Sequence, residues 1–189
     1  MSDYSLKPTS ALDEYKQKLN GTELRELIDV GKVSVAIPLG GEQAVDKILA
    51  NLFGVAIPAT GESVFSDDKN ARVIRLGKDQ LFVLLFDKQS DPRSTLAAKF
   101  GDVAYLTDQS DSWVGLEISG AKVRQVLERI CMVNLHPDVF RVDHIARTMM
   151  EHLGVLLIRN GEDSYQLMSA SSSAKSFLHA VTTSIRNVE

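Results

Sequence analysis

Apolar residues recur along the chain at two different spacings, which separate the expected strands from the expected helices. Alternating or continuous apolar positions predict strands at 33–37, 55–57, 73–76, 81–86, 103–106 and 113–118. Because the run at 81–86 is almost entirely apolar, we expect it at the centre of a sheet. Apolar residues three and four positions apart predict helices at 44–52, 92–100 and 123–131.

Glycine and proline residues mark where two of these helices begin and end. Pro92 suits the first turn of its helix, because the ring fixes φ and the missing N–H would have no partner there. Gly54 follows the helix at 44–52, in the position where left-handed backbone favours glycine. These signals support the helix boundaries read from the apolar spacing.

The end of the chain predicts a hairpin followed by a helix. Strands at 154–159 and 164–168 flank Asn160-Gly161, a pair typical of a two-residue type I′ turn. The serines at 171–173 offer a hydroxyl to cap the last helix. That helix is expected from 174 to 185.

The order of the elements predicts an α+β fold. Hairpins mixed with amphipathic helices indicate antiparallel or mixed sheets that carry helices on one face. Residues 1–22 are polar and are interpreted as an N-terminal arm, with a short helix at 12–19. Residues 23–189 are expected to form a single domain of two packed halves, about 23–91 and 92–189.

Composition and charge narrow the possible partners and location. Hydrophobic residues make up 44% of the 189 residues and charged residues 24%, an ordinary globular balance. A formal net charge of −4 argues against non-specific binding to nucleic acid or anionic membranes. The apolar runs are too short to span a bilayer, and Met1 to Ser5 lack the features of a signal peptide. We therefore expect a soluble, cytoplasmic protein with neither nucleic-acid nor membrane partners.

The residues able to bind metal or act as nucleophiles are few and scattered. The four histidines have neither HExxH nor HxH spacing: His136, His144, His152 and His179. Cys131 lies on the apolar stripe of its helix, where a free cysteine usually packs as a small hydrophobic residue rather than acting as a nucleophile. Leu39-Gly40-Gly41 lacks the further glycines and the Lys-Ser/Thr pair of a phosphate loop, so a turn is favoured.

The segment around residue 110 carries the remaining candidates. Asp108, Asp111 and Glu117 suggest a carboxylate pair for acid–base chemistry. Asx-turn hydrogen bonding accounts for the two aspartates without catalysis, and this interpretation is favoured. Trp113, the sole tryptophan, is expected either to anchor a partner or to pack on a sheet face.

Short motifs follow one another in an order that resembles one known family. Thr107 to Trp113 is similar to a D-x-S-D-x-W turn, and it runs into a strand that ends at Ser119-Gly120. The later matches are Val126-Leu127, Cys131, Asn134-Leu135, Arg147-Thr148, the hairpin from Val155 and the Ser-Ala start of the last helix. Over about Leu24 to Ile185 the chain resembles the gamma subunit of heterotetrameric sarcosine oxidase.

The chain departs from the pattern of that family at several positions. Leu76 to Gln80 is similar to the family's L-G-P-D-E-W turn, but other residues stand in place of the proline, glutamate and tryptophan: Lys78, Gln80 and Leu81. Asn134 stands where aspartate is usual, and Ser171 where arginine is usual. The resemblance therefore points to a divergent branch.

The resemblance implies a fold, a function and a set of partners. The fold would be like part of the folate-binding, aminomethyltransferase-type domains, built from ferredoxin-like split β-α-β units. The chain would be a non-catalytic accessory subunit that carries no catalytic, cofactor-binding or metal residue. The large alpha and beta subunits would hold FAD, FMN and NAD, oxidise sarcosine with oxygen and pass the one-carbon unit to tetrahydrofolate. The gamma chain would pack against them and support the assembly.

Two other functions stay open at this point. The shared architecture motivates a stand-alone folate-binding module or a one-carbon transferase-like protein. A self-associating scaffold protein without a link to a flavoenzyme is the other alternative.

Overall fold

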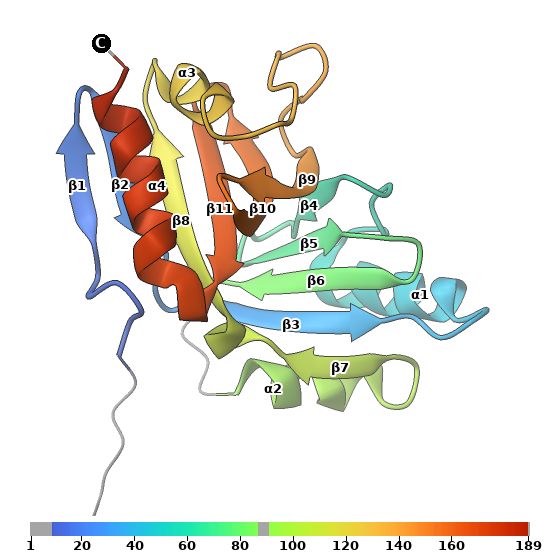
Figure 1. The fold of residues 1–189 in the computed structure, drawn as a ribbon. Helices are drawn as coiled ribbons and strands as arrows, with labels where there is room; N and C mark the ends of the chain where they lie inside the picture. The colour runs from blue at the N-terminus through green and yellow to red at the C-terminus, as the bar shows by residue number, and fades with distance from the viewer. Residues whose placement is uncertain (1–8, 87–90, 189) are drawn as a thin grey trace, which may run out of the picture.

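The computed structural model describes residues 9–86 and 91–188, which form two antiparallel sheets and four α-helices (Figure 1). The six-stranded sheet has the order β1-β2-β8-β11-β10-β9, and the five-stranded sheet has the order β4-β5-β6-β3-β7. In Figure 1 most strands of the larger sheet stand upright, whereas those of the smaller sheet run across the view. The α+β class predicted from the sequence is confirmed.

The strands of each sheet have the following bounds. The larger sheet contains β1 (Lys16–Leu19), β2 (Thr22–Glu26), β8 (Trp113–Ser119), β9 (Ile145–Met150), β10 (Leu153–Gly161) and β11 (Ser164–Ala170). The smaller sheet contains β3 (Gly31–Ala36), β4 (Ser63–Phe65), β5 (Ala71–Arg75), β6 (Gln80–Leu85) and β7 (Tyr105–Asp108). The chain passes from the smaller sheet to the larger one between β7 and β8, through the 3-10 turn η1 (Ser110–Ser112).

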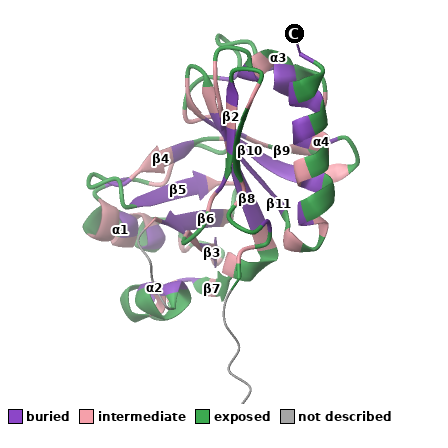
Figure 2. Cartoon of the chain, turned by 90° about the vertical axis from the view of Figure 1, so that its left-hand side faces the viewer, coloured by how far each residue is buried: buried purple, intermediate pink, exposed green. Residues whose placement is uncertain are grey.

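Each sheet packs a different pair of helices on its outer face. Helices α1 (Glu42–Phe53) and α2 (Pro92–Phe100) cover the smaller sheet, with Val45, Leu49 and Leu96 buried against its valines. Helices α3 (Val123–Glu128) and α4 (Ala174–Arg186) cover the larger sheet. Figure 2 shows the two pairs at opposite sides of the molecule, with the buried strands between them.

The inner faces of the two sheets meet in a third apolar layer. Successive side chains along a strand point to opposite faces, so residues that face the helices alternate with residues that face the other sheet. In β6, Leu81 and Val83 face the helices, whereas Phe82 faces the larger sheet. The layer between the sheets consists of Ile74, Phe82, Leu84, Ile145, Leu156, Ile158 and Met168.

Most of the elements read from apolar spacing are confirmed. The strands predicted at 33–37, 73–76, 81–86 and 113–118 correspond to β3, β5, β6 and β8, and β6 lies inside its sheet as expected. Helix α1 ends at Gly54, whose φ of 72° is the expected left-handed cap. Helix α2 begins at Pro92, and the Asp91 carboxylate accepts a hydrogen bond from the Ser94 amide at 2.8 Å.

Some boundaries differ by a few residues. The strand predicted at 103–106 is β7, two residues later, and α3 ends at Glu128 rather than at 131. Helix α2 and β7 belong with the smaller sheet, whereas β1 and β2 belong with the larger one, so the chain passes between the sheets after β2 and again after β7. Within the described ranges every helix is too short or too polar to span a lipid bilayer.

The strand predicted at 55–57 is wrong. The Ile57 amide donates to the Asp46 carboxylate of α1 at 2.7 Å, so it is not available for a strand ladder. The strand that follows α1 is instead β4 at Ser63–Phe65, which pairs with β5. Val55 is still buried, so its apolar character reflects core packing rather than strand formation.

The short helix predicted at 12–19 is also wrong, because residues 16–19 form the edge strand β1 paired with β2. Leu12 packs in the core of the larger sheet, so this part of the expected arm belongs to the sheet. Residues 1–8 of the expected arm lie outside the described residues. Asn20 and Gly21 join the two strands with φ values of 47° and 79°, the backbone that a type I′ turn requires.

The type I′ turn predicted at Asn160-Gly161 does not form. Gly161 pairs with Ser164, and the ladder shifts between Arg159 and Gly161, so the pair forms a bulge one step before the tip of the hairpin. Neither Asn160 nor Gly161 has a positive φ. The Arg159 side chain donates to the Gly161 carbonyl at 3.0 Å, which helps to hold the bulge.

The last helix is confirmed, but its predicted cap is not. Phe177, Val181 and Ile185 on α4 are fully buried. The serines at 171–173 form the 3-10 turn η2, and Ser173 makes no capping hydrogen bond through its side chain. Because the 3-10 turn leads directly into α4, its backbone takes the place of a capping hydroxyl.

Replacing Leu127 by alanine tests the packing of α3. The Leu127 side chain is fully buried between α3 and the larger sheet, so its truncation should lower the free energy of unfolding by about 2–5 kcal/mol. Urea denaturation followed by circular dichroism measures this change. Leu39→Ala is the matched control, because Leu39 is fully exposed and its loss should change stability by less than about 0.5 kcal/mol. Equal stabilities for the two variants would contradict this packing.

Candidate functional site

The segment 108–113 joins the two sheets, because β7 of the smaller sheet ends at Asp108 and β8 of the larger sheet begins at Trp113. The Asp108 carboxylate accepts a hydrogen bond from the Ser110 amide at 2.8 Å, which is the Asx turn favoured from the sequence. Glu117 instead forms an ion pair with Arg25 of β2 at 2.5 Å. Asp108 and Glu117 are therefore engaged in separate structural contacts.

Lys32 of β3 fixes this segment against the smaller sheet. Its backbone amide donates to the Ser110 hydroxyl at 3.0 Å, and its carbonyl accepts from the Gln109 amide at 2.7 Å. The buried Lys32 ammonium donates to the carbonyls of Val30 and Ser110 at 3.2 and 3.3 Å. Burial lowers the pKa of Lys32, and the carboxylates of Asp111, Asp108 and Glu26 oppose this shift. A lysine in an apolar strand gives no sequence signal of this role.

A small corner pocket of about 160 Å³ lies on one side of Trp113. The Trp113 ring meets Phe82 edge-on, with 5.9 Å between the ring centroids. The lining comes from both sheets and from the segment that joins them: Ser34, Leu76, Gln80, Phe82, Gln109, Trp113, Arg147 and Leu156. Trp113 therefore packs on a sheet face, which is one of the two roles considered for it, and also borders a pocket, whereas its role as a partner anchor stays a prediction.

Trp113 also lines a wider groove of about 1180 Å³. Its lining includes residues 26–32, 108–111 and 113–115. Glu26 is buried there, and its Oε1 accepts a hydrogen bond from the Leu12 amide at 3.1 Å. Within the described part of the chain, Glu26 Oε2 has no hydrogen-bond partner. Sequence reasoning missed Glu26 because nothing in the sequence indicates that its carboxylate is buried.

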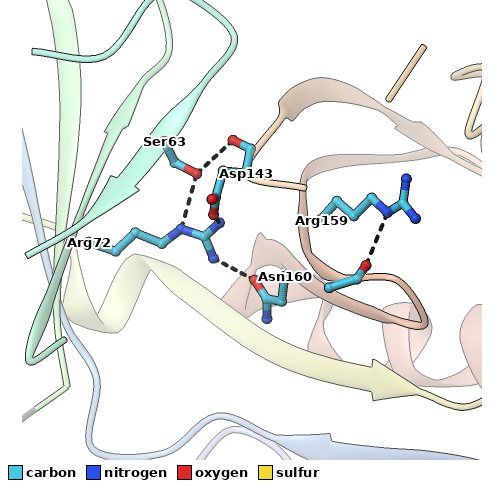
Figure 3. A network of polar contacts seen from close by, with 6 residues as sticks. Ser63, Arg72, Asp143, Arg159 and Asn160 are labelled. Carbon is cyan, nitrogen blue, oxygen red and sulfur yellow. Dashed lines mark hydrogen bonds and ion pairs between the residues drawn. The ribbon is translucent and has the colours of Figure 1, made fainter. Parts of the chain in front are cut away.

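Arg72 is the most deeply buried charged side chain and lies between the sheets (Figure 3). Its guanidinium donates to the Ser63 hydroxyl at 3.1 Å, to the Asp143 carboxylate at 2.7 Å and to the Asn160 side-chain oxygen. Its charge also lies 4.5 Å from the centre of the Phe65 ring. Ser63 belongs to the smaller sheet, whereas Asp143 and Asn160 belong to segments of the larger one, so the network joins the two.

Burial lowers the pKa of Arg72 to about 10, and the Asp143 carboxylate opposes this shift. The side chain therefore stays cationic at neutral pH, because its pKa lies well above 7. Sequence reasoning missed Arg72, although its place on the alternating positions of an apolar strand was a usable signal. Its donors are used within the fold rather than presented to a cavity.

The histidines and the cysteine do not converge. His144 lies 3.9 Å from Glu62, and His136 lies 3.6 Å from Asp138, at the two ends of one loop. Cys131 is buried, and this burial raises the pKa of its thiol. Among the described residues no group of three or more histidine, cysteine, aspartate or glutamate side chains is placed to hold a metal ion.

Comparison with known proteins identifies the family. No family model matches the chain. The sarcosine oxidase subunit gamma of Corynebacterium sp. strain P-1 is 30% identical over 159 residues, which is 83% of this chain and 76% of that protein. The chain belongs to the sarcosine oxidase subunit gamma family. The resemblance noted from the order of the short motifs is thereby confirmed.

Solved structures show the same fold. A chain of the heterotetrameric sarcosine oxidase from Corynebacterium sp. U-96, in complex with pyrrole 2-carboxylate, aligns with a TM-score of 0.77 and 24% identity. The alignment covers 90% of this chain and 87% of that chain. The glycine cleavage system aminomethyltransferase T from Bartonella henselae aligns with a TM-score of 0.60 and 14% identity, over 82% of this chain and 44% of that protein. The fold expected from the resemblance is thus confirmed.

Most of the short motifs that this chain shares with the gamma-family pattern lie in the core or in turns. Leu135 is fully buried in the core of the larger sheet, and the Asn134 side chain accepts a hydrogen bond from the His136 amide at 3.0 Å. Asparagine in place of aspartate therefore keeps a turn-forming acceptor. Arg147 differs, because it lies exposed on the edge strand β9 beside the corner pocket.

Replacing Arg72 by methionine tests whether its network holds the sheets together. The change should lower the free energy of unfolding by about 2–4 kcal/mol, because three acceptors lose their donor. The loss is smaller than for a fully buried pair, since the Asp143 side chain is 45% exposed and stays hydrated. Urea denaturation measures the change.

The matched control is Arg25→Met on β2. Arg25 also forms an arginine–carboxylate pair, but its side chain is 46% exposed, so the expected loss is below about 1 kcal/mol. If the two methionine variants lost the same stability, Arg72 would not hold the sheets together.

Proposed function

We propose that the chain is a non-catalytic accessory subunit of a flavin-dependent sarcosine oxidase complex, in which it supports assembly with the large subunits. The observation that carries this proposal is its membership of the gamma family over most of its length. In the proposed complex the alpha and beta subunits are the partners, and they hold FAD, FMN and NAD. The complex oxidises sarcosine in the cytoplasm and couples this reaction to one-carbon transfer to tetrahydrofolate.

The way the chain uses its buried polar groups supports an accessory role. The Arg72 guanidinium and the Lys32 ammonium both bind groups of the chain itself. Burial raises the pKa of the Cys131 thiol, so the thiol stays protonated at neutral pH. A protonated thiol is a poor nucleophile. The Arg72 and Lys32 side chains thus stabilise contacts within the chain.

A stand-alone folate-binding module is the second candidate. The groove beside Glu26 and Lys32, about 1180 Å³ in volume, is large enough for a ligand of folate size. The fold shared with aminomethyltransferase T is consistent with that possibility. Calorimetric titration of the isolated chain with tetrahydrofolate separates the candidates, because the accessory role predicts no heat of binding.

Co-expression with the large subunits tests the accessory role directly. We expect the chain to elute with them as one peak in gel filtration, and the isolated chain to be colourless because it holds no flavin. Omitting the chain should lower the melting temperature of the large-subunit assembly, since a bound partner stabilises the folded state. Turnover per bound flavin should stay the same.

Two results would contradict the accessory role. One is separate elution of the chain and the large subunits at micromolar concentration. The other is a loss of turnover per flavin, without loss of assembly, when the chain is omitted. The second result would place a functional group of this chain in the reaction.

A further inference from the structure

Arg147 of β9 is an exposed arginine that makes no hydrogen bond or ion pair with any described residue. It lies on the same face of the larger sheet as Ile145, which packs against the smaller sheet. Arg147 therefore follows Ile145 at the point where the layer between the sheets ends and the corner pocket begins. Since no described residue pairs with it, the guanidinium at this position is available for a group from outside the chain.

The polar lining of the corner pocket suits a carboxylate. Besides Arg147, it includes the side-chain amides of Gln80 and Gln109 and the hydroxyl of Ser34. None of the described lining residues is acidic. Arginine binds carboxylates through two parallel hydrogen bonds, and amides and hydroxyls supply further donors. An unpaired cation beside three neutral donors is thus complementary to a negative side chain.

The size of the corner pocket favours a single side chain over a small-molecule ligand. Pockets for cofactors and drug-sized ligands usually measure about 300–1,000 Å³. The corner pocket, at about 160 Å³, is well below this range. Its apolar members Trp113, Phe82 and Leu156 can pack against the methylene groups of an inserted glutamate or aspartate.

The surface around the pocket has features of a protein interface. Tyr105 of β7 and Met149 of β9, on edge strands of the two sheets, are 73% and 40% exposed. Tyrosine and methionine are enriched in interfaces. Strand β9 is also an edge strand, and no described strand pairs with its outer side between His144 and Met150. Arg147 therefore lies on an edge strand that also carries the exposed side chain of Met149.

We propose that this corner is the surface through which the chain docks on a large subunit, and that Arg147 binds an acidic side chain of that subunit. The inference rests on the proposed accessory function and deepens it by naming the docking surface. The complementarity of charge and the size of the pocket define the occupant as an aspartate or glutamate. Because the lining comes from both sheets, docking requires the two sheets to hold their relative position.

Charge reversal at Arg147 in the co-expressed complex tests the proposal. Arg147→Glu should raise the dissociation constant for the large subunits at least about 30-fold, which corresponds to about 2 kcal/mol, because two like charges would face one another. Arg147→Lys should have an intermediate effect, since lysine keeps the charge but loses the bidentate geometry. Biolayer interferometry with immobilised large subunits measures the affinities.

Lys175→Glu on α4 is the matched control. It changes the net charge by the same amount on an exposed residue of the first turn, where an acidic side chain is favourable. The control should bind the large subunits like the wild type, and both variants should melt like the wild type. If Arg147→Glu also bound like the wild type, or if Lys175→Glu weakened binding equally, the docking surface would be wrong.

The outcomes separate this inference from the function on which it rests. If the wild-type chain did not bind the large subunits, both the proposed accessory function and the proposed docking surface would be wrong. If the wild type bound and Arg147→Glu bound equally well, only the proposed docking surface would be wrong. Analytical ultracentrifugation of the chain alone tests whether a second copy of the chain occupies the corner instead. A wild-type dimer that becomes monomeric in Arg147→Glu would assign the corner to a second copy and contradict docking on a large subunit.

Discussion

The buried guanidinium of Arg72 holds the two sheets in one relative position. The apolar layer between the sheets favours contact but has little directionality, because burial of apolar surface does not depend on orientation. Arg72 adds direction, since its planar donors must meet Ser63 on one side and Asp143 and Asn160 on the other. A buried charge without these acceptors would be strongly unfavourable, so the sheets are constrained to keep them in place.

That constraint also explains the irregular backbone around the network. Asp143 has a φ of 68°, and its amide donates to the Arg159 carbonyl at 2.8 Å. The bulge at Asn160 places its side-chain oxygen against Arg72. With the sheets held in this relative position, the corner pocket is lined by residues of both sheets and by Arg147. A structural contact deep in the molecule thus positions a surface feature.

The sequence predicts this fold well where the local pattern and the packing agree. Strands such as β6 and helices such as α4 carry apolar spacing that also suits their places in the core. It fails where a distant partner decides the outcome, as at Asn160-Gly161, which bulges because Arg72 and Arg159 bind there. The same dipeptide at Asn20-Gly21 joins β1 and β2 with positive φ at both residues, and there the Asn20 side chain donates to the Ile185 and Val188 carbonyls.

The candidate site was predicted only in part, for a similar reason. The segment 108–113 was found from its turn-forming residues and its tryptophan, which are local signals. The roles of Lys32, Arg72 and Arg147 depend on contacts between strands far apart in the sequence, and neither composition nor spacing reports such contacts. The family resemblance motivates the proposed function, and the structure motivates the proposed docking surface.

The proposed function depends on docking through the corner between the two sheets. Hydrogen–deuterium exchange, measured by mass spectrometry on the free chain and on the chain assembled with the large subunits, tests this most directly. Docking through this corner should slow exchange on assembly in β9 and across 105–113, with no change in α4. Protection of α4 with unchanged exchange in β9 and 105–113 would contradict it.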